Sequence, residues 1–149
     1  MFFRALLRTD GSVSALVLRI FLAVVLFPHG AQKVFGWFGG PGLPAAMSML
    51  TVNMHIPLFF AILAIAAEFL GPIGLFFGFL TRIAAFGIAV EMAVAIPLAH
   101  LKFGFFMNWF GQKAVEGFEY HLLMIGMAIA LIIAGGGLWS VDRALTKRN

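Results

Sequence analysis

Ionisable side chains lie in or at the edges of four long apolar stretches of this chain. They are Arg19, His29, Lys33, Glu68, Glu91 and His121. A charge in hydrocarbon is costly, so such groups normally face a helix-bundle interior or a water-filled cavity, where they pair or act. Imidazole, ammonium and carboxyl groups can donate hydrogen bonds, stabilise developing charge and relay protons. These residues are therefore the first candidates for function.

The charged residues of the first stretch fall on one face of the expected helix. With about 100° per residue and Arg19 at 0°, His29 lies at about 280° and Lys33 at about 320°. Arg19 and Lys33 could reach the two membrane surfaces with their long side chains. The side chain of His29 is too short to do so, which makes His29 the most informative of the three.

Two carboxyl groups are predicted near mid-membrane on neighbouring antiparallel helices. Glu68 follows Pro57 by 11 residues, about 16 Å from the outer edge, and Glu91 follows Arg82 by nine residues, about 13 Å from the inner edge. Burial and a neighbouring carboxyl both disfavour ionisation of the two groups together. Two interpretations stay open: a buried Glu–Arg pair or a hydrogen-bonded neutral acid that fixes helix register, or a pair of carboxyls that handles protons.

A second polar group lies near the outer ends of the third and fourth stretches. His100, Glu119 and His121, together with His29, could form a cluster beneath the outer loops. Such a cluster could bind b-type haem or a divalent metal. No HxxxH or ExxH spacing occurs within one helix, so haem or metal stays an alternative and the prediction is that no metal is bound.

Four apolar stretches must position these residues: roughly 16–34, 56–79, 83–98 and 120–138. At 1.5 Å per residue each can cross the ~30 Å hydrocarbon core, the third only just. The chain of 149 residues is 62% hydrophobic and 11% charged, with a mean hydropathy of +1.04. So little charge cannot cover a soluble domain. We predict an all-α fold, an integral membrane bundle of four transmembrane helices that forms a single domain over residues 1–149.

Composition also excludes several function classes. The chain has no cysteine, which excludes disulfides, thiolate metal sites, covalent haem attachment and dithiol chemistry. Its ten Lys and Arg residues do not cluster as a nucleic-acid footprint would. The expected surroundings are therefore the lipid bilayer, with no nucleic-acid partner.

Positive charge predicts the orientation of the bundle. Four spans put both termini on one side, together with seven of the basic residues: Arg4, Arg8, Arg19, Arg82, Arg143, Lys147 and Arg148. Three lie on the other side: Lys33, Lys102 and Lys113. The positive-inside rule then predicts that both termini are cytoplasmic.

Aromatic and small residues add two weaker expectations. Trp37, in the Gly- and Pro-rich segment 36–44, suits the headgroup layer and is also a candidate cofactor contact. Small residues at four-residue spacing, such as Gly126, Ala130 and Ala134, allow close packing of helices and could also support a homo-oligomer.

Motifs that resemble those of a known family occur along nearly the whole chain. Arg19-Ile20-Phe21 followed by HGAQKVFGWFGGPG (residues 29–42) resembles the first-helix signature of the DoxX family. The segments EFLG (68–71) and GFLTR (78–82) resemble its second-helix pattern, and EMAVA (91–95) its M-x-x-A. GFEY (117–120) and GGGLWSVD (135–142) resemble the GxEY and the closing GxGxxSxD.

The resemblance implies a four-helix, multi-pass protein of a bacterial inner membrane. Family members include a quinone-reducing subunit linked to thiosulfate oxidation and proteins associated with oxidative-stress or thiol-redox complexes. By position, the motif residues are Arg19, His29, Gly30, Lys33, Glu68, Arg82, Glu119, Tyr120, Ser140 and Asp142.

We predict a redox-associated membrane protein that binds a quinone head group, as a subunit of a membrane oxidoreductase. Donation of hydrogen bonds, charge stabilisation and proton relay are expected from His29, Lys33, Glu68, Glu119 and Tyr120. Contact with the quinone is expected from His29, Lys33, Tyr120 and Trp37, and structural ion pairs from Arg19, Glu91, Arg82 and Asp142.

The chain has no electron donor of its own, so a protein partner must supply electrons or substrate. The alternative function is a non-catalytic assembly or scaffold subunit whose polar residues hold helices together. Whether the protein is an enzyme stays open. A small transporter is disfavoured, since inverted repeats are not evident.

Overall fold

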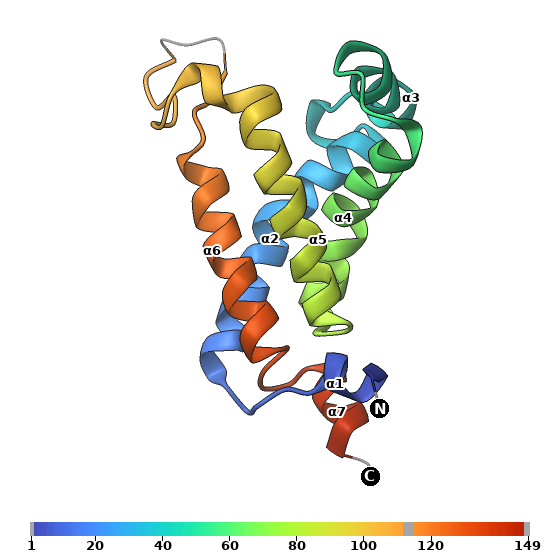
Figure 1. The fold of residues 1–149 in the computed structure, drawn as a ribbon, viewed down its shortest axis with the longest axis vertical. Coiled ribbons are helices and arrows are strands. Elements are labelled where there is room, and N and C mark those ends of the chain that lie inside the picture. Colours follow the sequence, from blue (N-terminus) through green and yellow to red (C-terminus); the bar gives the residue numbers. More distant parts are fainter. Residues whose placement is uncertain (1, 112–114, 148–149) are drawn as a thin grey trace.

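Four apolar helices build the body of the protein (Figure 1): α2 (Val13–Phe35), α4 (Leu58–Phe77), α5 (Thr81–Ala95) and α6 (Glu119–Ala134). The computed structural model describes residues 2–111 and 115–147, and within these ranges every regular element is helical. α5 continues through a π-helical turn (Ile96–His100) and a 3-10 turn (Leu101–Phe103). The predicted all-α fold is confirmed.

Shorter helices cap the two ends of the body. α1 (Phe2–Leu7) and α7 (Val141–Lys147) lie beside the chain termini. At the opposite end, a 3-10 turn (Trp37–Gly39), α3 (Gly42–Ser48) and a π-helical turn (Met49–Asn53) connect α2 to α4. We call the two ends the terminal end and the loop end, the latter holding residues 36–57 and 104–111.

The last apolar helix is shorter than the sequence predicts. Among the described residues, three helices are long and apolar enough to cross a membrane: Val13–Phe35, Leu58–Phe77 and Thr81–Phe103. α6 ends at Ala134 instead of Leu138, because Gly135 and Gly137 have positive φ angles (78° and 68°) that a right-handed helix does not contain. Its 16 residues span about 24 Å, less than a ~30 Å hydrocarbon core.

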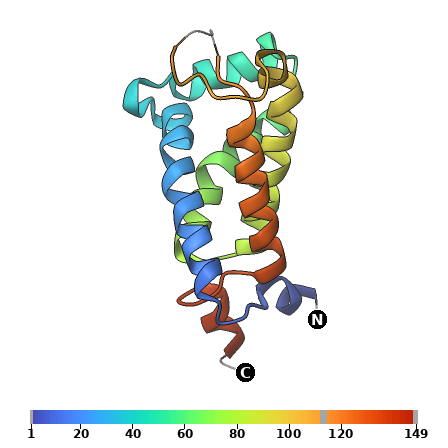
Figure 2. The ribbon, with the colours of Figure 1, turned by 90° about the vertical axis from the view of Figure 1, so that its left-hand side faces the viewer.

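The helices pack side by side in chain order (Figures 1 and 2). α2 packs mainly on α4, α4 on α5 and α5 on α6, with a smaller contact between α2 and α6. Both termini lie at the same end of the bundle. The side of the membrane that they face stays a prediction, and two residues of the charge argument, Lys113 and Arg148, lie outside the described residues.

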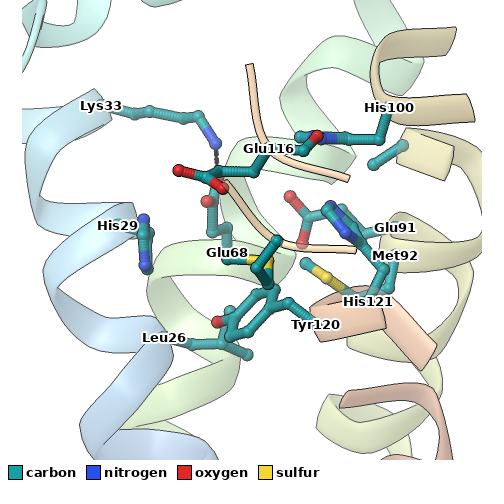
Figure 3. A pocket seen from close by; sticks show the side chains of 12 residues that line it. Leu26, His29, Lys33, Glu68, Glu91, Met92, His100, Glu116, Tyr120 and His121 are labelled. Atoms are coloured by element: carbon teal, nitrogen blue, oxygen red, sulfur yellow. Dashed lines mark hydrogen bonds and ion pairs between the residues drawn. The ribbon is translucent and has the colours of Figure 1, made fainter. Parts of the chain in front are cut away.

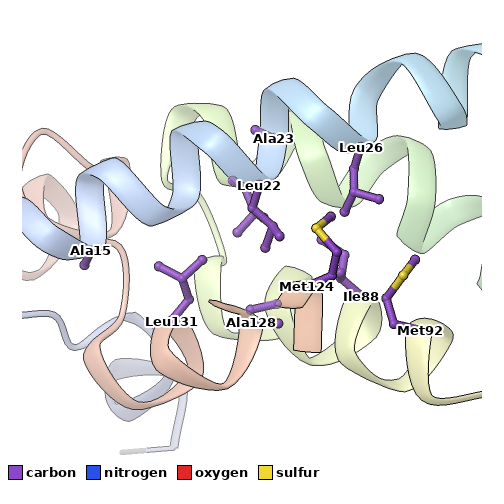
Figure 4. Close-up of a cluster of buried hydrophobic side chains, with 11 residues drawn as sticks. Ala15, Leu22, Ala23, Leu26, Ile88, Met92, Met124, Ala128 and Leu131 are labelled. Atoms are coloured by element: carbon purple, nitrogen blue, oxygen red, sulfur yellow. The ribbon is translucent and has the colours of Figure 1, made fainter. Parts of the chain in front are cut away.

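The hydrophobic core runs along the bundle axis (Figure 4). It is built by small and branched side chains from all four helices: Ala15, Leu22, Ala23, Leu26, Leu75, Ala85, Ile88, Met92, Met124, Ala128 and Leu131. In lipid, such close packing holds helices together in place of water exclusion.

A buried arginine joins three segments at the terminal end. The Arg19 guanidinium donates hydrogen bonds to the carbonyl oxygens of Leu75 (2.9 Å) and Phe76 at the end of α4. It also donates to the carbonyls of Gly136 (2.9 Å), Leu138 (3.2 Å) and Trp139 (3.1 Å). Carbonyls at a helix C-terminus lack intrahelical partners and carry partial negative charge, so a guanidinium with five N–H groups satisfies several of them.

Three of the four expected ion-pair residues therefore make other contacts. Arg19 binds carbonyl oxygens, and Arg82 does so too, at Ala5 (3.1 Å) and Ile133 (2.9 Å). Asp142 accepts hydrogen bonds from the backbone N–H groups of Leu80 (2.8 Å) and Thr81 (2.9 Å). It caps the N-terminus of α5 as a side-chain cap does. Among the described residues no salt bridge joins Arg19, Arg82 and Asp142, although the Asp142 carboxylate acts electrostatically on Arg19. Backbone groups at helix ends take the hydrogen bonds of all three side chains.

Candidate functional site

A cavity of about 310 Å³ lies between the helices in the loop-end half of the bundle (Figure 3). Its lining combines ionisable and aromatic residues with apolar ones: Leu26, His29, Lys33, Glu68, Glu91, Met92, Ala95, His100, Met107, Glu116, Tyr120 and His121. Each of the four body helices contributes at least one polar side chain. The cavity thus gathers residues that are far apart in the sequence.

The approach of α2 to α4 brings two charged side chains together. Lys33 forms an ion pair with Glu68, whose side chain is only 7% exposed while that of Lys33 is 32% exposed. Gly30 makes this possible, since a Cβ at this position would lie 2.3 Å from the carbonyl oxygen of Glu68. The glycine lets the two backbones touch one turn before Lys33.

The fourth expected ion-pair residue, Glu91, lies on the cavity wall. Its carboxyl group interacts with the carboxyl of Glu68 and with the charge of Lys33. The oxygen Oε2 of Glu91 is buried without a hydrogen-bond partner in the described chain. α5 runs antiparallel to α4, and Glu91 lies ten residues after the start of α5, which brings it to the level of Glu68. Arg19 binds backbone carbonyls at the terminal end instead. Glu91, which the sequence predicts in a structural ion pair, thus lies on the cavity wall near Glu68 and Lys33.

Aromatic and imidazole rings of α6 face the same cavity. The ring centroids of Tyr120 and His29 lie 6.3 Å apart, and those of His121 and His100 lie 4.1 Å apart. The Tyr120 hydroxyl and the His121 Nδ1 are both buried without a hydrogen-bond partner among the described residues. The wall therefore presents two polar atoms that no other described residue hydrogen-bonds.

The segment before α6 adds a residue that the sequence analysis did not single out. Glu116 lines the cavity, and its carboxylate accepts a hydrogen bond from the backbone N–H of Asn108. The backbone oxygen of Glu116 lies 2.9 Å from Nδ1 of His100. A lone acidic residue in a loop carries little signal in a sequence, and only the fold of residues 104–111 and 115–118 shows Glu116 at the site.

Two predicted site residues lie elsewhere. Trp37 is 52% exposed and packs on Phe35, with ring centroids 5.0 Å apart. Glu119 begins α6, where its backbone N–H donates to the carbonyl of Phe105 (2.9 Å). Neither lines the cavity. For Glu119 the reason is helical geometry, since about 100° separates it from Tyr120 and about 200° from His121.

Four other predicted residues come together as expected from their motifs: His29, Lys33, Glu68 and Tyr120 line one cavity. His100 and His121 join them, although in the part of the chain that the structure describes no three His, Cys, Asp or Glu side chains converge as metal ligands would. The cavity lining therefore offers hydrogen-bond donors, acceptors and exchangeable protons together with the apolar side chains of Leu26 and Met92.

Comparisons with known proteins agree with this architecture. The chain is 31% identical to the membrane protein Rv3486 of Mycobacterium tuberculosis, over 96% of this chain and 88% of that protein. It is also 31% identical to the inner membrane protein YqjF of Escherichia coli, over 91% and 95% of the two chains.

A third relative has a name that concerns redox chemistry. The chain is 30% identical to CatD of Bacillus subtilis, named as a candidate oxidoreductase, over 80% of this chain and 78% of that protein. No solved structure matches the chain. The model of the DoxX family matches residues 14–101, more than half of the chain. With the long alignments to these relatives, this match shows that the chain is a membrane protein of the DoxX family.

Proposed function

We propose that the cavity binds a quinone head group and that the protein is the quinone-binding subunit of a membrane oxidoreductase. One observation carries the proposal: Tyr120 Oη, His121 Nδ1 and Glu91 Oε2 are buried on the cavity wall without partners in the described chain. Buried polar atoms are normally hydrogen-bonded. Three of them around one cavity suit a ligand with polar atoms of its own.

The charges of the cavity favour a neutral ligand. Glu68, Glu91 and Glu116 supply three carboxyl groups, against the single ammonium of Lys33. An anionic ligand would meet repulsion from the carboxylates in surroundings of low dielectric constant. A quinone is neutral, and its two carbonyl oxygens accept hydrogen bonds of the kind that a tyrosine hydroxyl and an imidazole N–H donate.

Size and apolar lining point the same way. A volume of about 310 Å³ lies at the small end of ligand pockets, as a single substituted ring requires. Leu26, Met92, Ala95 and Met107 provide apolar contact for the ring. Tyr120, His29 and His121 would hold the carbonyl oxygens.

A bound quinone would supply a carrier for two electrons and two protons. The protein's part is to hold protons beside it. The carboxyl groups of Glu68 and Glu91 lie on the cavity wall, beside the ammonium of Lys33. Glu91 and Glu68 are thus placed to give or take a proton at the cavity wall.

The proposal includes the setting of the protein. The four apolar helices would all span the bacterial inner membrane, with both termini in the cytoplasm. The names of YqjF and CatD support an inner-membrane, redox-linked role. Because the chain contains no cysteine, a partner protein would deliver the electrons.

Quinone content tests the proposal. The protein is purified in mild detergent, and bound quinone is extracted and quantified for the wild type, Tyr120→Phe and the loop variant Trp109→Phe. We expect near-stoichiometric quinone in the wild type and the loop variant. Tyr120→Phe removes one hydrogen bond to the ligand, so its affinity for added quinone should be roughly three- to tenfold lower than that of the wild type.

Folding is monitored by circular dichroism and by elution as a single species in size-exclusion chromatography. A folded wild type that neither retains quinone nor binds added quinone would overturn the proposal. Variants that lose protein or a co-purifying complex, with no change in quinone, would favour the scaffold alternative.

A further inference from the structure

One flank of α2 is covered near the terminal end and uncovered near the loop end. At about 100° per residue, Leu22, Val25 and His29 follow one another on this flank. Leu22 is fully buried, whereas Val25 is 40% exposed and His29 is exposed as well. The helix therefore leaves its neighbour as it approaches the loop end.

The neighbour on this flank is α6. The rings of His29 and Tyr120 approach to 6.3 Å, and the two helices run in opposite directions, so Val25 and Leu123 each lie about one turn closer to the terminal end. Leu123 is 68% exposed. Figure 1 shows α2 and α6 diverging toward the loop end, while below this level Leu22 and Leu131 pack together in the core.

His29 marks the place where the cavity reaches the surface. It lines the cavity and is exposed at the same time. It lies six residues before the end of α2, about 9 Å from the loop end of that helix. An imidazole facing lipid alone is costly, but an imidazole at the edge of a polar cavity is not. Exposed valine and leucine side chains, by contrast, are ordinary on a helix that faces lipid, so the exposure of His29 is the more informative observation.

We infer that the cavity opens sideways into the bilayer between α2 and α6, and that its ligand is an amphiphile whose apolar tail leaves between Val25 and Leu123. The inference rests on the proposed quinone site and narrows the ligand to tailed, lipid-soluble quinones. The head lies against Tyr120 and the Lys33–Glu68 pair. The tail reaches hydrocarbon without crossing the loop end.

Two quinones that differ in their tails test the opening. Dissociation constants of decylubiquinone and of the tail-less duroquinone are measured for protein in lipid nanodiscs. Val25→Trp and Leu123→Trp place bulk at the opening, and Val24→Trp is the matched control on another face of α2, where Val24 is 56% exposed. We expect Val25→Trp and Leu123→Trp to raise the dissociation constant of decylubiquinone at least tenfold and that of duroquinone less than twofold. The Val24→Trp control should change neither dissociation constant.

The sideways opening would be overturned if the opening variants weakened the binding of both quinones equally, or if Val24→Trp had the same effect as the opening variants. A wild type that binds neither quinone would overturn the quinone site instead. The opening is then judged by thiol labelling, which the cysteine-free chain allows. A maleimide carried on a lipid tail should label Leu26→Cys in the cavity but not Leu131→Cys in the core, and Val25→Trp should suppress the labelling. Absence of labelling at Leu26→Cys would overturn the opening by itself.

Discussion

At the residue scale, Lys33 and Glu68 form an ion pair on the cavity wall. Glu68 is buried and Lys33 is one-third exposed, so removing the ammonium leaves a carboxyl group in apolar surroundings. Removing the carboxyl leaves an ammonium that can still reach the loop end with its flexible stem. Removing the ammonium of Lys33 should therefore destabilise the protein more than removing the carboxyl of Glu68.

A double-mutant cycle measures this pair. Lys33→Met should lower the free energy of unfolding by about 3 kcal/mol, because it strands a buried carboxyl, and Glu68→Gln should cost less. In Lys33→Met/Glu68→Gln the cost should fall well below the sum of the single costs. Thermal unfolding in one detergent gives all four values. Additive costs would show that the two side chains do not interact.

At the element scale, one glycine sets the distance between α2 and α4. The close approach at Gly30 fixes both the packing of the two helices and the level at which Lys33 meets Glu68. Gly126 on α6 is the opposite case, since a Cβ there would meet nothing within 4 Å. The same substitution at these two sites separates close packing from helix propensity.

Gly30→Ala should destabilise the protein by about 1–3 kcal/mol, because the new methyl group forces the α2 and α4 backbones apart. Gly126→Ala should be neutral or stabilise by up to about 1 kcal/mol, as alanine favours a helix over glycine. Unfolding midpoints of the two variants check both signs. Equal effects would contradict the packing role of Gly30.

At the scale of the whole molecule, the two ends of the bundle are built differently. The terminal end is closed by Arg19 and Asp142, which join α2, α4, α5 and the segment after α6 through backbone hydrogen bonds. The loop end holds the cavity and its ionisable side chains. Backbone hydrogen bonds thus fix one end of the bundle, and the other end carries the candidate site.

The orientation of these ends can be measured with reporters. Charge predicts that a fusion after residue 147 is cytoplasmic and that an insertion in the segment 105–110 is on the opposite side. A cytoplasmic fluorescent reporter should therefore be active at the C-terminus, and a periplasmic phosphatase should be active in the loop. The reverse pattern would place the cavity at the cytoplasmic side.

Much of the element level could be predicted from the sequence. Apolar runs and their lengths indicated the four helices of the body, since hydropathy and helix length are local properties. The exception is the end of α6, where positive φ angles at Gly135 and Gly137 stop the helix early. The predicted span ran through the three consecutive glycines at 135–137 to Leu138, because hydropathy alone does not mark the end of a helix.

The sequence by itself determined that this is a helical membrane protein, which polar residues lie within its apolar runs, and to which family its motifs belong. The tertiary structure decided which of those residues meet. It joined Lys33 to Glu68, placed Glu91 and Glu116 on the cavity wall and left out Trp37 and Glu119. The reason is that the rotation and depth of each helix depend on contacts between helices, such as Gly30 against α4 and Arg19 against the ends of α4 and α6. No pattern within a single helix contains that information.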